Sequence, residues 1–216
     1  MTLKAVRLIK ENDIIAVPGA DVRETVAYKI AVQAVPELAD KELLPIYMPM
    51  THDKAELELN HEKGAKALEA ALDTGKNVVF LTLGDPTIYS TYMYIHRIVK
   101  AKGYETTIIS GIPSFCAAAA RLDDSLVDRA EELHVIPSSY GIEAALNYSG
   151  TKILMKSASG ISEVKRTLEE KDGNVNVKMI ENCGMPEERI YERIEDVPEQ
   201  AGYYSLLIVK ESEKER

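Results

Sequence analysis

The stretch VVFLTLGDPTIYST, residues 78–91, passes from largely apolar or β-branched residues through Gly84-Asp85-Pro86 into a cluster of Ser, Thr and Tyr. This change predicts a strand followed by a helix over residues 87–102, because an Asp side chain accepts the free N–H groups of a first helical turn and the fixed φ of proline suits the first helical position. Ligands of open α/β sheets bind beyond the carboxyl ends of the strands. The loop is therefore a plain helix cap or a binding site, and its spacing leaves both interpretations open.

Strand-like apolar segments alternate with helical patterns through the first half of the chain. The strand candidates are residues 14–17, 43–49, 78–83 and 106–110, and the helices between them cover residues 22–35, 54–74 and 87–102. Short, nearly continuous apolar strands are typical of a parallel sheet that is covered on both faces. We therefore expect an α/β fold whose first domain has a mainly parallel, doubly wound sheet.

The second half of the chain is richer in strands. The candidates are residues 134–137, 152–156, 175–181, 189–194 and 203–210. The last three are separated by short connections that favour hairpins, so we expect a mixed sheet with an antiparallel portion. The GIPS break after Ser110 places the boundary between an N-terminal domain over residues 1–111 and a C-terminal domain over residues 112–216.

The composition disfavours several classes of partner. The chain has 216 residues, 45% of them hydrophobic, which is enough for a sizeable core, and its formal net charge of −9 argues against nucleic acid. No stretch approaches the roughly 20 consecutive apolar residues of a membrane span, and the first residues carry no cleavage site. We expect a cytoplasmic protein that binds neither nucleic acid nor a membrane.

Metal-binding and phosphate-binding motifs are missing from the sequence. Cys116 and Cys183 have no CxxC partner, and the four histidines lack the i, i+4 spacing of a helical metal pair, so we predict no metal site. No G-x-G-x-x-G, G-x-x-x-x-G-K-[ST] or G-x-S-x-G motif occurs. The residue patterns alone indicate an α/β protein that binds a small molecule.

Five segments in colinear order resemble the tetrapyrrole methylases. They are LTLGDPTIYSTYMYI (81–95), SGIPSFCAAAARL (110–122), TKILMK (151–156), NCGMPEERI (182–190) and YYSLLIVK (203–210). The PMTHDK segment (49–54), together with SFCAAAARL, is similar to the subgroup that methylates C-20 of precorrin-2 or cobalt-factor II in cobalamin synthesis. The resemblance implies two αβα domains that hold S-adenosylmethionine between them and release S-adenosylhomocysteine.

The resemblance also implies which residues bind the methyl donor. Leu83, Gly84, Asp85 and Ile88 match positions on the ribose and methionine side of the donor. Weaker matches, in segments where the family uses backbone atoms, are Pro113, Ser114, Met155, Cys183 and Leu206.

The substrate of such an enzyme carries many carboxylates, which need local cations. The candidate residues for contact with the tetrapyrrole are Arg23, Lys29, Arg97, Arg121 and Lys156 among the cations and Tyr89 and Tyr92 among the aromatics. The sulfonium of the donor already carries a good leaving group, the thioether of S-adenosylhomocysteine, so the transfer itself requires no general base. We therefore assign no catalytic residue.

One departure from the family pattern concerns the start of the chain. Members of the family that this sequence resembles usually begin with a glycine-rich strand, G-x-G-x-G-D-P, before the TLKAVRLI helix. This sequence starts inside that helix. We expect an unpaired sheet edge and a more open active site. Family resemblance further implies a homodimer.

Three alternatives remain open on the sequence. The first is a tetrapyrrole methylase that acts at a different ring position or on a different substrate. The second is a truncated, non-catalytic protein that binds S-adenosyl compounds. The third is an unrelated nucleotide-binding enzyme in which Asp85-Pro86 is only a helix cap.

Overall fold

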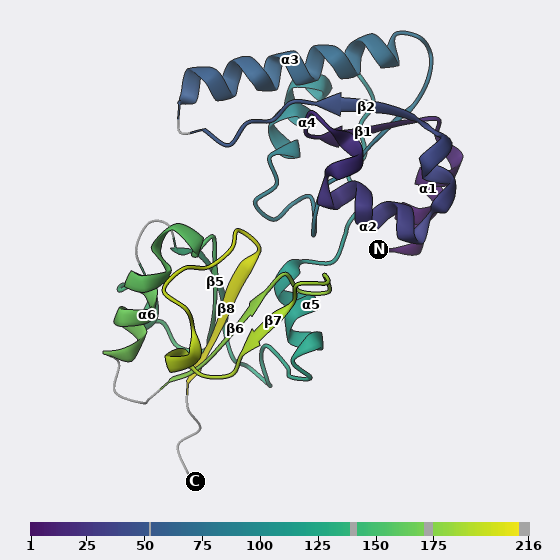
Figure 1. The fold of residues 1–216 in the computed structure, drawn as a ribbon. Helices are drawn as coiled ribbons and strands as arrows, with labels where there is room; N and C mark the ends of the chain where they lie inside the picture. The colour runs from purple at the N-terminus through teal and green to yellow at the C-terminus, as the bar shows by residue number, and fades with distance from the viewer. Residues whose placement is uncertain (52, 139–141, 171–174, 212–216) are drawn as a thin grey trace. The chain divides into compact units, whose positions relative to one another are not determined.

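The computed structural model describes residues 1–51, 53–138, 142–170 and 175–211 (Figure 1). The chain divides into two compact units, Met1–Pro113 and Ser114–Arg216. Each unit has a sheet of its own. In the described residues no helix is both long enough and apolar enough to cross a membrane.

The first unit is built on a parallel sheet with the strand order β2-β1-β3. Its elements, in chain order, are α1 (Leu3–Glu11), β1 (Ile14–Pro18), η1 (Val22–Glu24), α2 (Val26–Ala34), η2 (Pro36–Asp40), β2 (Glu42–Ile46), α3 (Lys54–Leu72), β3 (Val78–Phe80) and α4 (Tyr92–Ala101). The expected parallel α/β sheet is therefore confirmed.

Helices cover both faces of this sheet. The α1, α2 and η2 segments pack around Ile15 and Val17 on one face, and α3 and α4 pack around Ala16 and Ile46 on the other (Figure 1). Two helix starts follow from local chemistry, because the Thr2 hydroxyl accepts from the Ala5 amide and Asp53 caps α3 in the same way. The result is an αβα layer structure.

Two expectations for the end of this unit are wrong. Residues 106–110 form no strand, and the strand that begins at Val78 ends at Phe80 and lies at the edge of the sheet. Apolar, β-branched residues become a strand only where a neighbouring strand supplies backbone partners. Among the described residues β3 is paired with β1 alone, and segment 106–110 forms no ladder with its free edge.

The second unit contains a mixed five-stranded sheet with the order β4-β5-β8-β6-β7. Its elements are α5 (Ser114–Arg121), β4 (Leu133–Pro137), η4 (Ala145–Asn147), β5 (Thr151–Met155), η5 (Ala158–Gly160), α6 (Ile161–Glu169), β6 (Val175–Glu181), β7 (Arg189–Tyr191), η6 (Ile194–Asp196) and β8 (Ser205–Glu211). Strands β4 and β5 are parallel and the other pairs are antiparallel, which confirms the predicted mixed sheet. The expected hairpin between β7 and β8 is wrong, because β6 lies between them.

The two helices α5 and α6 lie on opposite sides of this sheet (Figure 1). Ile161, Val164 and Leu168 of α6 pack on Leu154 and Leu207, which are fully buried. Both units are thus three-layered, which agrees with the fold class expected from the sequence.

Candidate functional site

The loop after β3 is organised as a turn around Asp85. One carboxylate oxygen, Oδ1, accepts the Thr87 amide at 2.9 Å and the Thr87 hydroxyl at 2.6 Å. The Ile88 amide donates to the Asp85 carbonyl at 3.1 Å. The prediction that Asp85 caps a helix from residue 87 is therefore wrong, because these short-range bonds close a turn and α4 begins only at Tyr92.

The other carboxylate oxygen of Asp85 reaches a segment far along the chain. Oδ2 accepts the Gly111 amide at 2.9 Å across 26 residues. The two segments also touch, because a Cβ on Gly111 would lie 1.9 Å from the Gly84 carbonyl oxygen. Asp85 and the contact between the two glycines together hold the 84–88 turn against the residues that precede Pro113.

The carboxylate and the backbone of this loop face different surroundings. Asp85 is only 8% exposed, whereas Gly84 is exposed and has a φ of 68°. Hydrogen bonds from the Thr87 hydroxyl and amide, and then from the Gly111 amide, lower the pKa of Asp85. The carboxylate is therefore ionised at neutral pH and accepts three protein donors, while the backbone at Gly84 is accessible to a ligand.

Hydroxyl groups brace the base of the same loop. Thr82 Oγ1 and Ser90 Oγ lie 3.0 Å apart and bridge its two ends. Beyond the loop, the Tyr92 hydroxyl contacts His96 Nδ1 at 3.2 Å, and its ring packs on Phe80. Of the two tyrosines expected to flank a tetrapyrrole, Tyr92 is thus bound to its own helix and sheet.

Two of the cations expected to bind carboxylates, Arg23 and Lys29, have partners within the first unit. Arg23 donates to the Tyr28 hydroxyl and the Ala39 carbonyl, each at 3.2 Å. Lys29 pairs with Glu24 at 2.8 Å. Tyr89, by contrast, is 46% exposed within the loop and has a φ of 51°.

The other three candidate cations are Arg97, Arg121 and Lys156. Arg97 is exposed and lies over the Tyr94 ring, 5.8 Å from its centroid. Arg121, in the second unit, pairs with Glu188 at 2.6 Å. Lys156 is exposed directly after β5 and has a φ of 59°.

In the second unit, two of the residues expected at the donor site are neighbours. Met155, at the carboxyl end of β5, pairs in register with Leu206 of β8. The Ser138 hydroxyl donates to the Met155 carbonyl at 2.9 Å and lies 2.6 Å from the Ser157 hydroxyl. Buried hydroxyls therefore hold the carboxyl end of β5.

Cys183 lies just beyond the carboxyl end of β6. Burial raises the pKa of its thiol, which keeps it neutral. Ser114 is the first residue of α5, and Pro113 is the last residue of the first unit.

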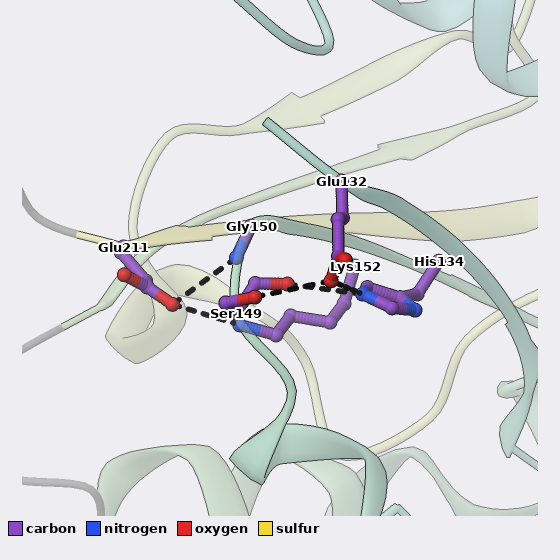
Figure 2. Close-up of polar contacts among 6 residues, drawn as sticks. All are labelled: Glu132, His134, Ser149, Gly150, Lys152 and Glu211. Carbon is purple, nitrogen blue, oxygen red and sulfur yellow. Dashed lines mark hydrogen bonds and ion pairs between the residues drawn. The ribbon is translucent and has the colours of Figure 1, made fainter. Parts of the chain in front are cut away.

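A separate polar cluster occupies the amino ends of β4 and β5 (Figure 2). His134 Nε2 lies 3.0 Å from the Ser149 carbonyl and 3.4 Å from Glu132. Lys152 is 1% exposed, and its Nζ lies 3.5 Å from Glu211. Ligands of parallel strands bind at their carboxyl ends, so this cluster ties strand ends together and belongs to no expected site. In the described part of the chain no three His, Cys, Asp or Glu side chains form a group that could hold a metal.

Comparison with known proteins shows the family of the chain. The family described as Tetrapyrrole (Corrin/Porphyrin) Methylases matches residues 1–198. The chain is a tetrapyrrole methylase. A probable cobalt-precorrin-2 C(20)-methyltransferase of Methanocaldococcus jannaschii is 31% identical over 214 residues, which cover 97% of this chain and 90% of the relative. The cobalt-precorrin-2 C(20)-methyltransferase of Salmonella typhimurium is 27% identical, again over 97% of this chain and 90% of the relative.

Solved structures share the fold of this tetrapyrrole methylase. The uroporphyrin-III C-methyltransferase of Thermus thermophilus, in complex with S-adenosylhomocysteine, is similar with a TM-score of 0.68 and 18% identity. The match covers 97% of this chain and 90% of that chain. At this identity the likeness concerns the fold.

Sequence reasoning missed two residues that shape the loop of this tetrapyrrole methylase. Thr87 and Gly111 supply the three donors to the Asp85 carboxylate. The Asp-x-Thr spacing is a signal for a side-chain turn that competes with a helix start. Gly111 carried only the signal of a break, because its partner lies 26 residues away.

Proposed function

We propose that this chain transfers the methyl group of S-adenosylmethionine to C-20 of precorrin-2 or of cobalt-factor II in cobalamin biosynthesis. The observation that carries the C-20 assignment is its 31% identity to a probable cobalt-precorrin-2 C(20)-methyltransferase along nearly the whole chain. The cobalt of cobalt-factor II arrives within the substrate and needs no protein ligand. The assay with both substrates therefore decides between cobalt-factor II and metal-free precorrin-2.

The loop geometry fits a nucleoside donor. Gly84 is exposed, lacks a Cβ and has a φ of 68°, so its backbone can approach a ribose or the methionine carboxylate closely. In this proposal Leu83, Gly84, Asp85 and Ile88 form the donor-binding loop. Further donor contacts come from the backbone of Pro113, Ser114, Met155, Cys183 and Leu206.

S-adenosylmethionine, when bound, supplies a methyl group on a sulfonium that a nucleophilic carbon of the tetrapyrrole can attack in line. The protein residues need only hold the two reactants and exclude water, since well-oriented reactants gain effective molarities worth about 7–11 kcal/mol. No side chain of the loop is placed as a base, because the Asp85 carboxylate is occupied by three protein donors. Tyr89, which is half-exposed in the loop, is the aromatic residue we assign to the tetrapyrrole.

Mass spectrometry of the pigment tests this function. The chain is incubated with S-adenosylmethionine and, in parallel, with precorrin-2 and cobalt-factor II. We expect one methyl-for-hydrogen replacement in at least one substrate, and NMR of a product made with a ¹³C-labelled methyl group should place the carbon at C-20. A methyl group at another ring carbon would assign the chain to a different reaction of the family.

Calorimetry with S-adenosylhomocysteine complements the turnover assay. Binding without any product would identify a non-catalytic S-adenosyl-binding protein. The absence of both binding and product would refute the proposed function. A cytoplasmic homodimer remains the expected form, and sedimentation at 24.0 kDa alone would contradict the dimer.

A further inference from the structure

We propose that the Asp85 carboxylate is a positioning group that never contacts the methyl donor. It holds the 84–88 turn against Gly111, so that backbone groups of the loop, and not the carboxylate, meet the donor. The inference rests on the proposed function and concerns how its donor loop is built. It assigns to Asp85 a role opposite to that of a direct ligand of the ribose.

The first argument is that the carboxylate has little capacity left. Oδ1 accepts two donors from Thr87, at 2.9 and 2.6 Å, and Oδ2 accepts the Gly111 amide at 2.9 Å. An ionised carboxylate offers about four acceptor positions, and Asp85 is 8% exposed. A ribose hydroxyl would therefore find about one acceptor position, on Oδ2 of a buried side chain, unless it displaced one of the three protein donors and left that donor unsatisfied.

The second argument is the direction in which the loop faces. Along three successive positions Leu83 is half-buried, Gly84 is exposed and Asp85 is buried. The side that solvent reaches is therefore the glycine backbone, and the carboxylate points to the opposite side, toward Gly111. A ligand that approaches the exposed side meets peptide groups first.

The third argument is that the held segment tolerates no other spacing. A Cβ on Gly111 would lie 1.9 Å from the Gly84 carbonyl oxygen, 2.9 Å from its carbon and 3.3 Å from Asp85 Cα. The two backbones are thus in direct contact, and the Gly111 bond to Oδ2 lies beside that contact. We therefore expect a change in the carboxylate bond to move the exposed backbone of Gly84 as well.

The main experiment is a binding cycle on Asp85→Asn. Its amide retains one acceptor for Thr87 but presents N–H groups, instead of an oxygen, to the Gly111 amide. We expect S-adenosylhomocysteine to bind about tenfold more weakly, the cost of one unsatisfied donor. The affinity for the 2′-deoxy and 3′-deoxy analogues of this ligand should fall by the same factor from the wild type to Asp85→Asn, because the free energies of independent changes are additive. If the factor vanished for either analogue, the carboxylate would be a direct ribose ligand and the proposal would be wrong.

Two further variants separate the Gly111 bond from the rest of the turn. Thr87→Val removes one hydroxyl donor and leaves the Gly111 bond, so we expect a change in affinity of less than about threefold. Gly111→Ala leaves the carboxylate intact and moves the segment, and it should weaken binding at least as much as Asp85→Asn. Unchanged affinity in a folded Gly111→Ala protein would overturn the proposal.

Amide exchange of the wild-type protein requires no variant. The Gly111 N–H should be protected from hydrogen exchange both in the free protein and with S-adenosylhomocysteine bound. Loss of this protection on binding would mean that the ligand takes the carboxylate, which contradicts the proposal. If the wild-type protein bound no S-adenosylhomocysteine at all, the proposed function itself would fail. This result differs from one in which the wild type binds but the Asp85→Asn comparison contradicts the positioning role.

Discussion

Asp85 in the first unit and Glu181 in the second are two buried carboxylates with the same kind of partner. Glu181 is 6% exposed, and it accepts the Gly202 amide at 2.6 Å and the Tyr191 hydroxyl at 3.1 Å. Asp85 likewise accepts a glycine amide from a later segment, Gly111. Each carboxylate lies at or just past the carboxyl end of a strand.

The backbones around these two carboxylates differ. Glu181 is itself a strand residue, paired in register with Arg189 on one side and Ser205 on the other. Asp85 lies beyond an edge strand and has no ladder. The Glu181 bonds therefore add to a backbone that two strands already hold, whereas the Asp85 bonds link a loop to Gly111 without any strand pairing in the described residues. We infer that loss of the first costs stability and that loss of the second also moves a binding loop.

The sharpest test of this difference replaces the two glycine partners. Gly111→Ala would bring Cβ to 1.9 Å from a carbonyl oxygen, whereas Gly202→Ala meets its nearest neighbour, Glu181 Oε1, at an ordinary 3.5 Å. We expect Gly111→Ala to lower the free energy of unfolding by about 3 kcal/mol and Gly202→Ala by less than about 0.5 kcal/mol. Urea titration of both variants measures this, and equal losses would contradict the comparison.

A smaller effect is expected when the second carboxylate is changed. Glu181→Gln keeps one acceptor for the Gly202 amide, and its new N–H group can donate to the Tyr191 hydroxyl in place of accepting from it. The loss should therefore be only that of a charge-assisted bond, about 0.5–1.5 kcal/mol of stability. Because paired strands hold the backbone there, the Gly111 amide should exchange as slowly as in the wild type. Thermal melting and amide exchange of the same sample check the two statements. Faster exchange at Gly111 would show that the two carboxylates are not independent.

Acid should affect the first unit through its buried histidines. Burial lowers the pKa of His61 and of His96 below the ordinary 6.5, and for His96 the nearby Lys100 and Arg97 act in the same direction. The unfolded chain then binds protons before the folded one, so the free energy of unfolding falls as pH drops below 6.5 and is unaffected well above it. Asp85 adds its own loss only below its ordinary 3.8.

Melting temperatures between pH 7.5 and 5 measure the histidine effect. The control is His96→Gln, which cannot titrate and should show a smaller decline over this range. A steeper decline in the variant, or a wild-type stability that rises as the pH falls, would contradict the prediction.

The smallest effect is expected at the amino ends of β4 and β5. Lys152 is 1% exposed, and its ion pair with Glu211 is long, at 3.5 Å. Burying an ammonium costs several kcal/mol, which so long a contact repays poorly, so Lys152→Met should leave the stability unchanged or raise it by about 1 kcal/mol. Calorimetric melting checks this, and a loss above about 2 kcal/mol would mean that the pair is stronger than its length indicates.

Most elements follow from local pattern, and the exceptions have physical causes. Strands β1, β5 and β6 and helix α3 lie within a few residues of their predicted bounds, because apolar periodicity acts over one or two turns. The predicted strand at residues 106–110 failed because pairing is a property of two segments and not of one.

The donor loop divides in the same way. Glycine, an acidic residue and proline after an apolar strand were enough to locate the loop and, with the other segments, to indicate the family. The sequence could not tell that Asp85 closes a turn instead of capping a helix, since both uses of its carboxylate are local and compete within a few residues.

The amino-acid order alone was sufficient for the class of fold, the family and the position of the candidate loop, because these depend on short-range patterns of apolar, glycine and capping residues. Only the folded chain decided that the Asp85 carboxylate is occupied and that Gly111 lies against Gly84. That contact joins residues 26 positions apart along the chain. It exists because packing of the whole first unit brings two backbones together, and no local preference of either segment encodes it.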